Sequence, residues 1–458
     1  MSMKLFRRLI SVVLITAVVL SFAGCSLRFS NFDELLRPPK AAGKFQGLRE
    51  AFEKVVTSDY ILCTPENGDY KSAFLTFDCD SDGDEDAIVF YALKSEPDVA
   101  RLCYFRSEND EWIPVSSADG AGSSVNIVMF SDINYDKTFE IIVGWNILSG
   151  KTNKVFVTYL ISGDKLTPLT AYPYSYLTLL DANGDGREDI FTMSVDSSVP
   201  DMLSGYARVY HYNTNTATLD VLSETRTDGN VSGYTSVVTE KVEDTNYIYV
   251  EATKGENESI TEVLYWDSRK NENKLVSPLF DVESQTTKST WRSINISCMD
   301  VDSDGFLEIP VSVTNTDYLP NSAGVELQDT SSETMGFIKW VRFRSGRLNN
   351  VCYSIVNEKM DYVMKIPSSW VERILIKNTD GQIDVYRWLS SSQKTGDLLF
   401  SIYCYASSDE NSKNEYSGCK ALGSSGDRNY VYRITDAGSS FGVKDKAFEK
   451  DFIMKDFG

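Results

Sequence analysis

The chain has 458 residues, with 66 Asp and Glu against 45 Lys and Arg, and a formal net charge of −21 at pH 7. Nucleic-acid binding depends on clustered Lys and Arg, so this charge argues against a nucleic-acid partner. The charge also argues against docking on anionic lipid or teichoic acid, unless calcium bridges the two surfaces. The single histidine, His211, lies in a Tyr-His-Tyr run, and the sequence motifs of the common hydrolases and phosphate-binding loops are missing. Histidine-dependent hydrolysis is therefore not expected.

The first 25 residues predict an export signal. Three of the first eight residues are basic, residues 9–23 are almost wholly apolar, and Ala23-Gly24-Cys25 ends the segment. This pattern resembles a bacterial lipoprotein signal, which implies a signal peptide over residues 1–24 and lipidation of Cys25. A retained helix is the alternative, but about 15 apolar residues fall short of the roughly 20 that span a bilayer. We therefore expect a lipid-anchored protein on the outer face of the bacterial cytoplasmic membrane.

Two short segments follow the anchor. Residues 25–43 include Pro38 and Pro39 and predict an extended tether. Part of it, residues 33–40, resembles the start of mature lipoproteins from clostridia-like bacteria, a likeness that suggests a lineage and no activity. Residues 44–57 predict a short amphipathic helix that packs on the fold. Its apolar residues at helical spacing are Phe45, Leu48, Phe52, Val55 and Val56.

The chain then repeats one acidic loop of nine residues at 78–86, 132–140, 181–189 and 300–308. Carboxylates or Asn occupy positions 1, 3, 5 and 9, and calcium requires six to eight such oxygen ligands, some of them backbone carbonyls. We expect side-chain ligands at these positions and a carbonyl ligand at position 7. The candidate metal ligands are Asp78, Asp80, Asp82, Asp84 and Asp86; Asp132, Asn134, Asp136, Thr138 and Glu140; Asp181, Asn183, Asp185, Arg187 and Asp189; and Asp300, Asp302, Asp304, Phe306 and Glu308.

Position 6 separates the second loop from the other three. Glycine stands there in three loops and permits the backbone reversal, whereas Lys137 stands there in the second, which makes that site doubtful. An EF-hand is rejected because it needs Glu at position 12, where these loops have Val or Thr. Runs rich in β-branched and aromatic residues flank the loops, so each unit is a strand, a loop and a strand. One such loop could be an ordinary Asx-rich turn, but four copies favour metal sites.

The spacing of the loops predicts the architecture. The first aspartates stand at 78, 132, 181 and 300, so the intervals are 54, 49 and 119 residues. The last interval is about two of the others, which predicts a unit without a metal loop near residue 240. Periods of about 50 residues made of short strands are typical of β-propeller blades. Strands at 87–93, 100–106, 112–116 and 125–131 make the first blade in this interpretation.

We predict a mainly β fold. A β-propeller of about five four-stranded blades would occupy residues 58–352, with six or seven blades left open, and the strand at Phe74 would close the ring against the last unit. The loops resemble the FG-GAP or VCBS-type repeats of integrin-α-like propellers, whose pattern is D-x-[DN]-x-D-G-x-x-[DE] before an apolar strand. This resemblance covers about residues 70–350. It implies structural Ca²⁺ at three to four sites on the blades, with ligands bound elsewhere on the disc.

Residues 353–458 contain none of the acidic loops and consist of strand-like runs, polar turns and a possible helix, which predicts a separate α+β domain. The pattern Tyr-x-x-x-Ile-Pro-x-x-Trp at 362–370 weakly resembles the opening of PsbP-like domains and carries no function. Seven cysteines follow Cys25, and Cys404 and Cys419 flank a polar loop where a disulfide could form.

The function expected from these observations is binding. We predict a cell-surface lipoprotein whose calcium-stabilised propeller binds or scaffolds cell-wall glycan or protein partners without catalysis. Residues 172–176, with three tyrosines, are the segment where an exposed aromatic patch is expected. One alternative is an extracellular polysaccharide-degrading enzyme, which would need two carboxylates about 5 to 9.5 Å apart in a cleft. The second alternative is an envelope assembly or sensing lipoprotein whose C-terminal domain binds a protein partner.

Overall fold

The computed structural model describes residues 43–109, 111–148, 154–196, 203–269, 272–313, 334–379, 382–392, 394–455 and 457. The predicted signal peptide, Cys25 and all of the tether before residue 43 lie outside these residues. Within the described part of the chain, no helix has both the length and the apolar character needed to cross a membrane.

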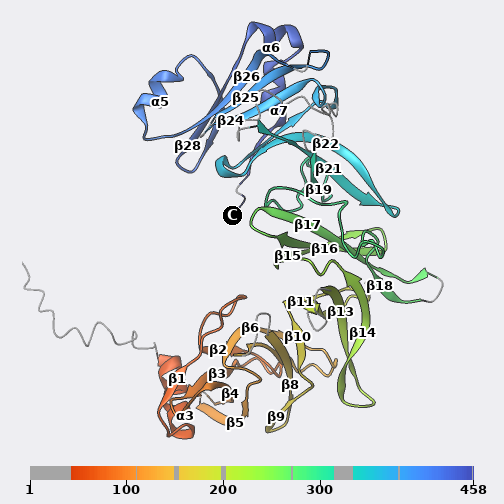
Figure 1. The fold of residues 1–458 in the computed structure, drawn as a ribbon. Helices are drawn as coiled ribbons and strands as arrows, with labels where there is room; N and C mark the ends of the chain where they lie inside the picture. Colours follow the sequence, from red (N-terminus) through yellow and green to blue (C-terminus); the bar gives the residue numbers. More distant parts are fainter. Residues whose placement is uncertain are drawn as a thin grey trace, which may run out of the picture.

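The fold is mainly β and consists of six antiparallel sheets that follow one another along an open arc (Figure 1). The first sheet contains β1 (Tyr60–Leu62), β2 (Phe74–Phe77), β3 (Asp86–Leu93), β4 (Glu96–Glu108) and β5 (Glu111–Asp119). The second contains β6 (Ser124–Ser131), β7 (Glu140–Asn146), β8 (Lys154–Ser162), β9 (Lys165–Pro168) and β10 (Tyr172–Tyr174). The third contains β11 (Tyr176–Leu180), β12 (Asp189–Asp196), β13 (Ser204–Asn213) and β14 (Thr218–Thr227).

The other three sheets complete the arc. The fourth contains β15 (Gly233–Val242), β16 (Thr245–Lys254), β17 (Glu258–Asp267) and β18 (Lys274–Val276). The fifth contains β19 (Ile309–Val313), β21 (Phe337–Arg344), β22 (Arg347–Asn357), β23 (Tyr362–Ile366) and β29 (Phe452–Met454). The sixth contains β20 (Thr334–Met335), β24 (Ile374–Thr379), β25 (Gln382–Leu389), β26 (Lys394–Ala406), β27 (Lys420–Ser425) and β28 (Arg428–Ile434). The helices are α3 (Gly43–Val55), α5 (Glu410–Glu415), α6 (Asp436–Phe441) and α7 (Asp445–Asp451), with 3₁₀ turns η2 (Glu358–Met360) and η3 (Ser368–Trp370).

The first five sheets repeat one blade-like plan. In the first, second and third sheets the acidic loop joins two paired antiparallel strands, β2 with β3, β6 with β7 and β11 with β12, and further antiparallel strands follow. In the fifth sheet the loop leads into β19, the first strand of that sheet, and a single bridge between Met299 and Glu308 closes the loop. The fourth sheet has the same plan without the loop, because only Glu243 and Asp244 join β15 to β16. The predicted five units, including the metal-free one near residue 240, are therefore confirmed.

Two details of the predicted propeller are wrong. The strand at 125–131 lies in β6 and begins the second sheet, so it does not complete the first. The strand at Phe74 lies in β2 and pairs with β3 of its own sheet, with Phe74 opposite Val89. It therefore belongs to the first sheet and not to the last unit, and Figure 1 places the first and sixth sheets at opposite ends of the arc.

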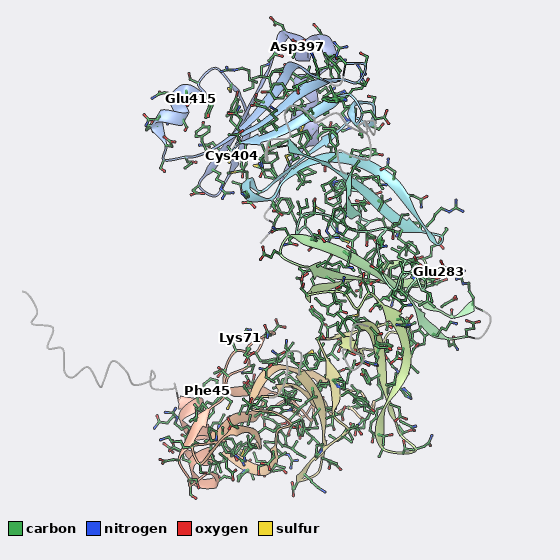
Figure 2. All side chains as sticks on the ribbon, viewed as in Figure 1. Phe45, Lys71, Glu283, Asp397, Cys404 and Glu415 are labelled. Atoms are coloured by element: carbon green, nitrogen blue, oxygen red, sulfur yellow. The ribbon has the colours of Figure 1, made fainter. Side chains whose placement is uncertain are left out.

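The hydrophobic core is a series of layers between neighbouring sheets. One layer joins the first two sheets and contains Phe90, Tyr104 and Trp145, and others join each following pair. Helix α3 covers the first sheet with Leu48 and Phe52, which are fully buried. Phe45 and Val55 were expected on the same face but are exposed, and Phe45 is labelled in Figure 2.

The fifth and sixth sheets are interlocked. Strand β20 leaves the fifth unit to pair with β24, and β29 returns from the end of the sixth to pair with β23. Phe337 and Ile355 of the fifth sheet share one core with Ile376 and Phe400 of the sixth. The predicted domain start at residue 353 falls inside β22 of the fifth sheet.

Candidate calcium-binding loops

The four acidic loops share one backbone conformation. At position 6 the φ angles are 97° for Gly83, 84° for Gly186, 89° for Gly305 and 76° for Lys137. All four lie in the left-handed region, which glycine enters freely and a lysine enters at a cost. Position 4 is also left-handed in every loop, with φ between 59° and 80°. The second loop thus adopts the same shape as the others in spite of Lys137.

Hydrogen bonds hold this shape in the same way each time. The carboxylate at position 1 accepts from the N–H at position 6 over 2.8 to 3.1 Å. The carboxylate at position 5 accepts from the N–H at position 7 over 2.8 to 3.1 Å. These are Asx-type turns, which Asp forms readily. They turn the side chains of alternate residues toward the inside of the loop.

Position 9 holds the buried carboxylate of each loop. Asp86, Glu140, Asp189 and Glu308 are at most 6 % exposed, and each accepts from the N–H at position 2 over 2.9 to 3.3 Å. Burial raises the pKa of Asp86 to about 6, of Glu140 to about 8 and of Asp189 to about 7, and it also raises the pKa of Glu308. Other loop carboxylates add to the shift. A nearby cation would favour the ionised form of such groups.

The first loop fits a calcium ion best. Oxygens of Asp78, Asp80 and Asp82 lie within 4.8 Å of one another. The Oδ1 atoms of Asp78 and Asp80 are buried, and neither has a hydrogen-bond partner among the described residues. Buried carboxylate oxygens without donors are costly, and hard oxygen donors are what calcium prefers. Arg106 is the nearby cation, with its Nε 3.7 Å from Asp80 Oδ2.

The fourth loop also gathers its carboxylates but fits an ion less well. Oxygens of Asp300, Asp302 and Asp304 lie within 4.8 Å of one another. The guanidinium of Arg342, however, lies 2.8 Å from Asp304 Oδ2 and also pairs with the buried Glu308. A positive charge is therefore already present beside the loop, and a divalent cation would meet it at close range.

In the second and third loops an amide takes part in the cluster. Asn134 Nδ2 donates to Glu140 Oε1 over 2.7 Å and to Asp136 Oδ2 over 3.1 Å. Asn183 Nδ2 donates to Asp185 Oδ2 over 3.2 Å. These donors satisfy part of the carboxylate oxygens without a metal. The amide orientation that offers oxygen to an ion would differ from this one.

Strand register places one further residue beside each loop. The ladders after the loops include the pairs Ala87–Phe105, Ile141–Tyr159, Ile190–Tyr210 and Ile309–Val341. Extending each ladder by one residue pair toward its loop places position 9 opposite a residue of the neighbouring strand. These residues are Arg106, Leu160, His211 and Arg342 for the first, second, third and fourth loops. The sequence analysis missed this position because it depends on hairpin register. For the first loop, where residues 94 and 95 join β3 to β4, counting back from that turn would have been the sequence signal.

The loops also contact one another from sheet to sheet. Phe139 N–H donates to Cys79 O over 2.6 Å, and Ser81 Oγ donates to Lys137 O over 3.0 Å. The guanidinium of Arg187 lies 3.9 Å from the ring centroid of Tyr135. Further along, Asn246 Nδ2 donates to Asp181 O over 2.8 Å. Leu307 N–H donates to Glu240 Oε1 over 2.7 Å, so the row reaches the fifth sheet.

Other predicted features fall elsewhere. The expected aromatic patch at 172–176 is mostly covered, because Tyr174 is 2 % exposed and Tyr172 is half-buried. Tyr172 OH donates to Leu219 O over 2.6 Å, which explains its orientation toward the third sheet. Cys404 and Cys419 are free thiols in this structure.

Comparison with known proteins assigns no family: no family model and no curated protein matches the chain. Similar solved structures include the periplasmic gluconolactonase PpgL of Pseudomonas aeruginosa, at 11 % identity and TM-score 0.29 over 75 % of this chain and 95 % of that one. Sqt1 of Chaetomium thermophilum is 10 % identical with TM-score 0.30 over 69 % and 68 %. The rhamnogalacturonan lyase YesW is 12 % identical with TM-score 0.27 over 74 % and 85 %. At these TM-scores the likeness supports no functional conclusion, and the fold class rests on the strand pairing of the chain itself.

Proposed function

We propose that this protein is an extracellular, lipid-anchored module that binds or scaffolds cell-wall glycan or a protein partner and is stiffened by calcium. It would act without catalysis. The observation that carries the proposal is the first loop, where buried oxygens of Asp78 and Asp80 have no donor among the described residues. Such loops in extracellular modules bind calcium at about 10⁻⁴ to 10⁻³ M, so calcium would fill them outside the cell.

The stiffening follows from the contacts between loops. An ion that fixes the first loop also fixes Cys79 O and Ser81 Oγ, which bond the second loop. The FG-GAP or VCBS-type likeness of the loop pattern supports the same role. The predicted lipoprotein signal supports placement on the outer face of the membrane, where wall polymers and surface proteins are the available partners.

Calcium binding is tested with a matched pair of variants in the first loop. Asp80→Asn removes a candidate ligand charge, whereas Asp84→Asn changes a position expected to contribute only its backbone carbonyl. We expect Asp80→Asn to lower the melting temperature in 2 mM calcium and to leave it unchanged in EGTA. Asp84→Asn should match the wild type in both. An equal loss in both buffers for Asp80→Asn would show that Asp80 is not a ligand.

Partner binding is tested by co-sedimentation of the full-length chain with purified cell-wall sacculi, in 2 mM calcium and in EGTA. We expect sedimentation with calcium and little without it, because the loops order the sheets that carry the binding surface. No sedimentation in either buffer would exclude the wall and leave a protein partner.

A further inference from the structure

A pocket lies where β2, β6, β11 and β15, one strand from each of the first four sheets, approach one another. It is lined by Phe77 of β2, residues 126–130 of β6, residues 176–179 of β11, and Tyr234 and Thr235 of β15, with residues 67–70 at its rim. These strands lie toward the hollow of the arc (Figure 1). The pocket has a volume of about 640 Å³. Small-molecule sites commonly measure about 300 to 1,000 Å³.

The rim of the pocket is fixed in place. Glu66 N–H and Asn67 N–H donate to the carbonyls of Val125 and Asn126 over 3.2 and 2.8 Å. Gly68 has φ 80°, and a Cβ there would lie 2.9 Å from Ile127 Cγ1, so only glycine allows this close approach. Lys71, labelled in Figure 2, donates from Nζ to Glu66 O over 2.5 Å and closes the turn. The rim is thus a built structure on β6.

The pocket offers aromatic surface. Phe77 stacks on Phe130 with ring centroids 4.2 Å apart, and Tyr70 meets the same ring edge-on at 5.1 Å. Tyr70, Phe77 and Tyr176 are half-buried, so each keeps part of its surface accessible. Packing against Phe130 orients Tyr70 and Phe77 without hiding them. Such rigid, amphipathic rings favour a ligand with an apolar face and polar edges.

The polar groups of the pocket carry little net charge. Asn67, Asp69 and Thr235 are exposed on its walls. Lys154 is the cation among the lining residues, and its Nζ lies 5.9 Å from the ring centroid of Tyr174. Asp69 and Lys154 have opposite signs, whereas recognition of phosphate depends on clustered Arg or Lys. The lining therefore suits an uncharged ligand that has many hydroxyl groups.

We propose that this pocket binds an uncharged oligosaccharide. The C–H faces of sugar rings match the exposed parts of Tyr70 and Tyr176, and the hydroxyl groups match the amide, carboxylate and hydroxyl groups on the walls. A peptide added as a strand would need a free sheet edge. Residues 66 and 67 already occupy part of the β6 edge. This inference rests on the proposed binding function and names its ligand and its location.

The test uses calorimetry on the full-length chain in 2 mM calcium, with N-acetylglucosamine tetramer, cellotetraose and xylotetraose as probes. Thr235→Trp places a large side chain in the pocket from an exposed position and should abolish binding. Thr239→Trp is the matched control, because Thr239 is exposed on the same strand outside the pocket. Asn67→Ala, which removes one side-chain hydrogen bond, should weaken binding roughly two- to tenfold.

Melting temperatures in calcium and EGTA, measured on the same samples, separate this inference from the proposed function. Saccharide binding that is lost in Thr235→Trp and kept in Thr239→Trp supports the pocket. Binding that survives in Thr235→Trp overturns it. A calcium-dependent melting temperature without binding of any of the three saccharides overturns the pocket alone. Failure of calcium to change the melting temperature counts against the proposed function only.

Discussion

We predict that Arg342 takes the place of a calcium ion in the fourth loop, and Arg342→Leu tests this directly. Leucine is the matched choice because Leu160 stands at the same register position beside the second loop. The substitution removes the guanidinium that pairs with Glu308, whose side chain is fully buried. Removing one partner of a buried ion pair costs about 3 to 5 kcal/mol. Arg342 is 18 % exposed, so water screens part of the interaction, and we expect a loss of about 2 to 3 kcal/mol in EGTA.

Calcium should recover part of this loss in Arg342→Leu. The loop carboxylates remain, and a site with a Kd of about 10⁻⁴ to 10⁻³ M contributes about 0.6 to 1.8 kcal/mol at 2 mM calcium. Denaturant unfolding in both buffers measures the difference, and calorimetry should count one more bound calcium than in the wild type. Arg347→Leu, an exposed change in the same hairpin, is the control. An equal loss in both buffers, with no additional calcium, would refute the role given to Arg342.

Two further predictions concern other parts of the fold. Glu262 is fully buried, and burial raises its pKa from the ordinary 4.5 to about 7. The native state therefore holds the proton more tightly, so stability falls as pH rises from about 4.5 to about 7. The total is about 3 kcal/mol, at about 1.36 kcal/mol for each pH unit. Glu262→Gln cannot ionise, so its stability relative to the wild type should rise by this amount over that range in denaturant unfolding, and a constant difference would contradict the reasoning. Lys137→Gly should raise stability in EGTA by roughly 0.5 to 1 kcal/mol, because the left-handed backbone costs lysine about 1 to 2 kcal/mol and glycine gives back part of this in chain entropy. A lower melting temperature for that variant would show that the backbone at Lys137 carries no strain.

The sequence predicted the local units well, because each unit is encoded within about 50 residues. The acidic loops lie between apolar runs, and the doubled interval before Asp300 identified the unit near residue 240 that lacks a loop. The helix at 44–57 was found from its spacing, although two of its five apolar residues are exposed. In these cases the signal and the structure it specifies lie close together in the chain.

The features that were not predicted depend on contacts between distant residues. The partner of β29 is β23, and nothing near residue 452 in the sequence indicates this pairing. Arg342 reaches Glu308 only because β21 pairs with β19 in one register. The pocket is formed by residues from four sheets, so no single segment carries its pattern. The open arc was not predicted for the same reason. The spacing of the loops indicates the number of units but not the path that the units follow in space.

The pairing of β29 with β23 has a consequence for the time course of synthesis. Strand β23 ends at Ile366 and β29 begins at Phe452, which is 86 residues later. At a synthesis rate of about 5 to 20 residues per second, β29 is made roughly 4 to 17 s after β23. During that interval its edge is unpaired, and unpaired edges are sites of aggregation. The nascent chain therefore still exposes this edge late in its production, after most of the arc has already been made.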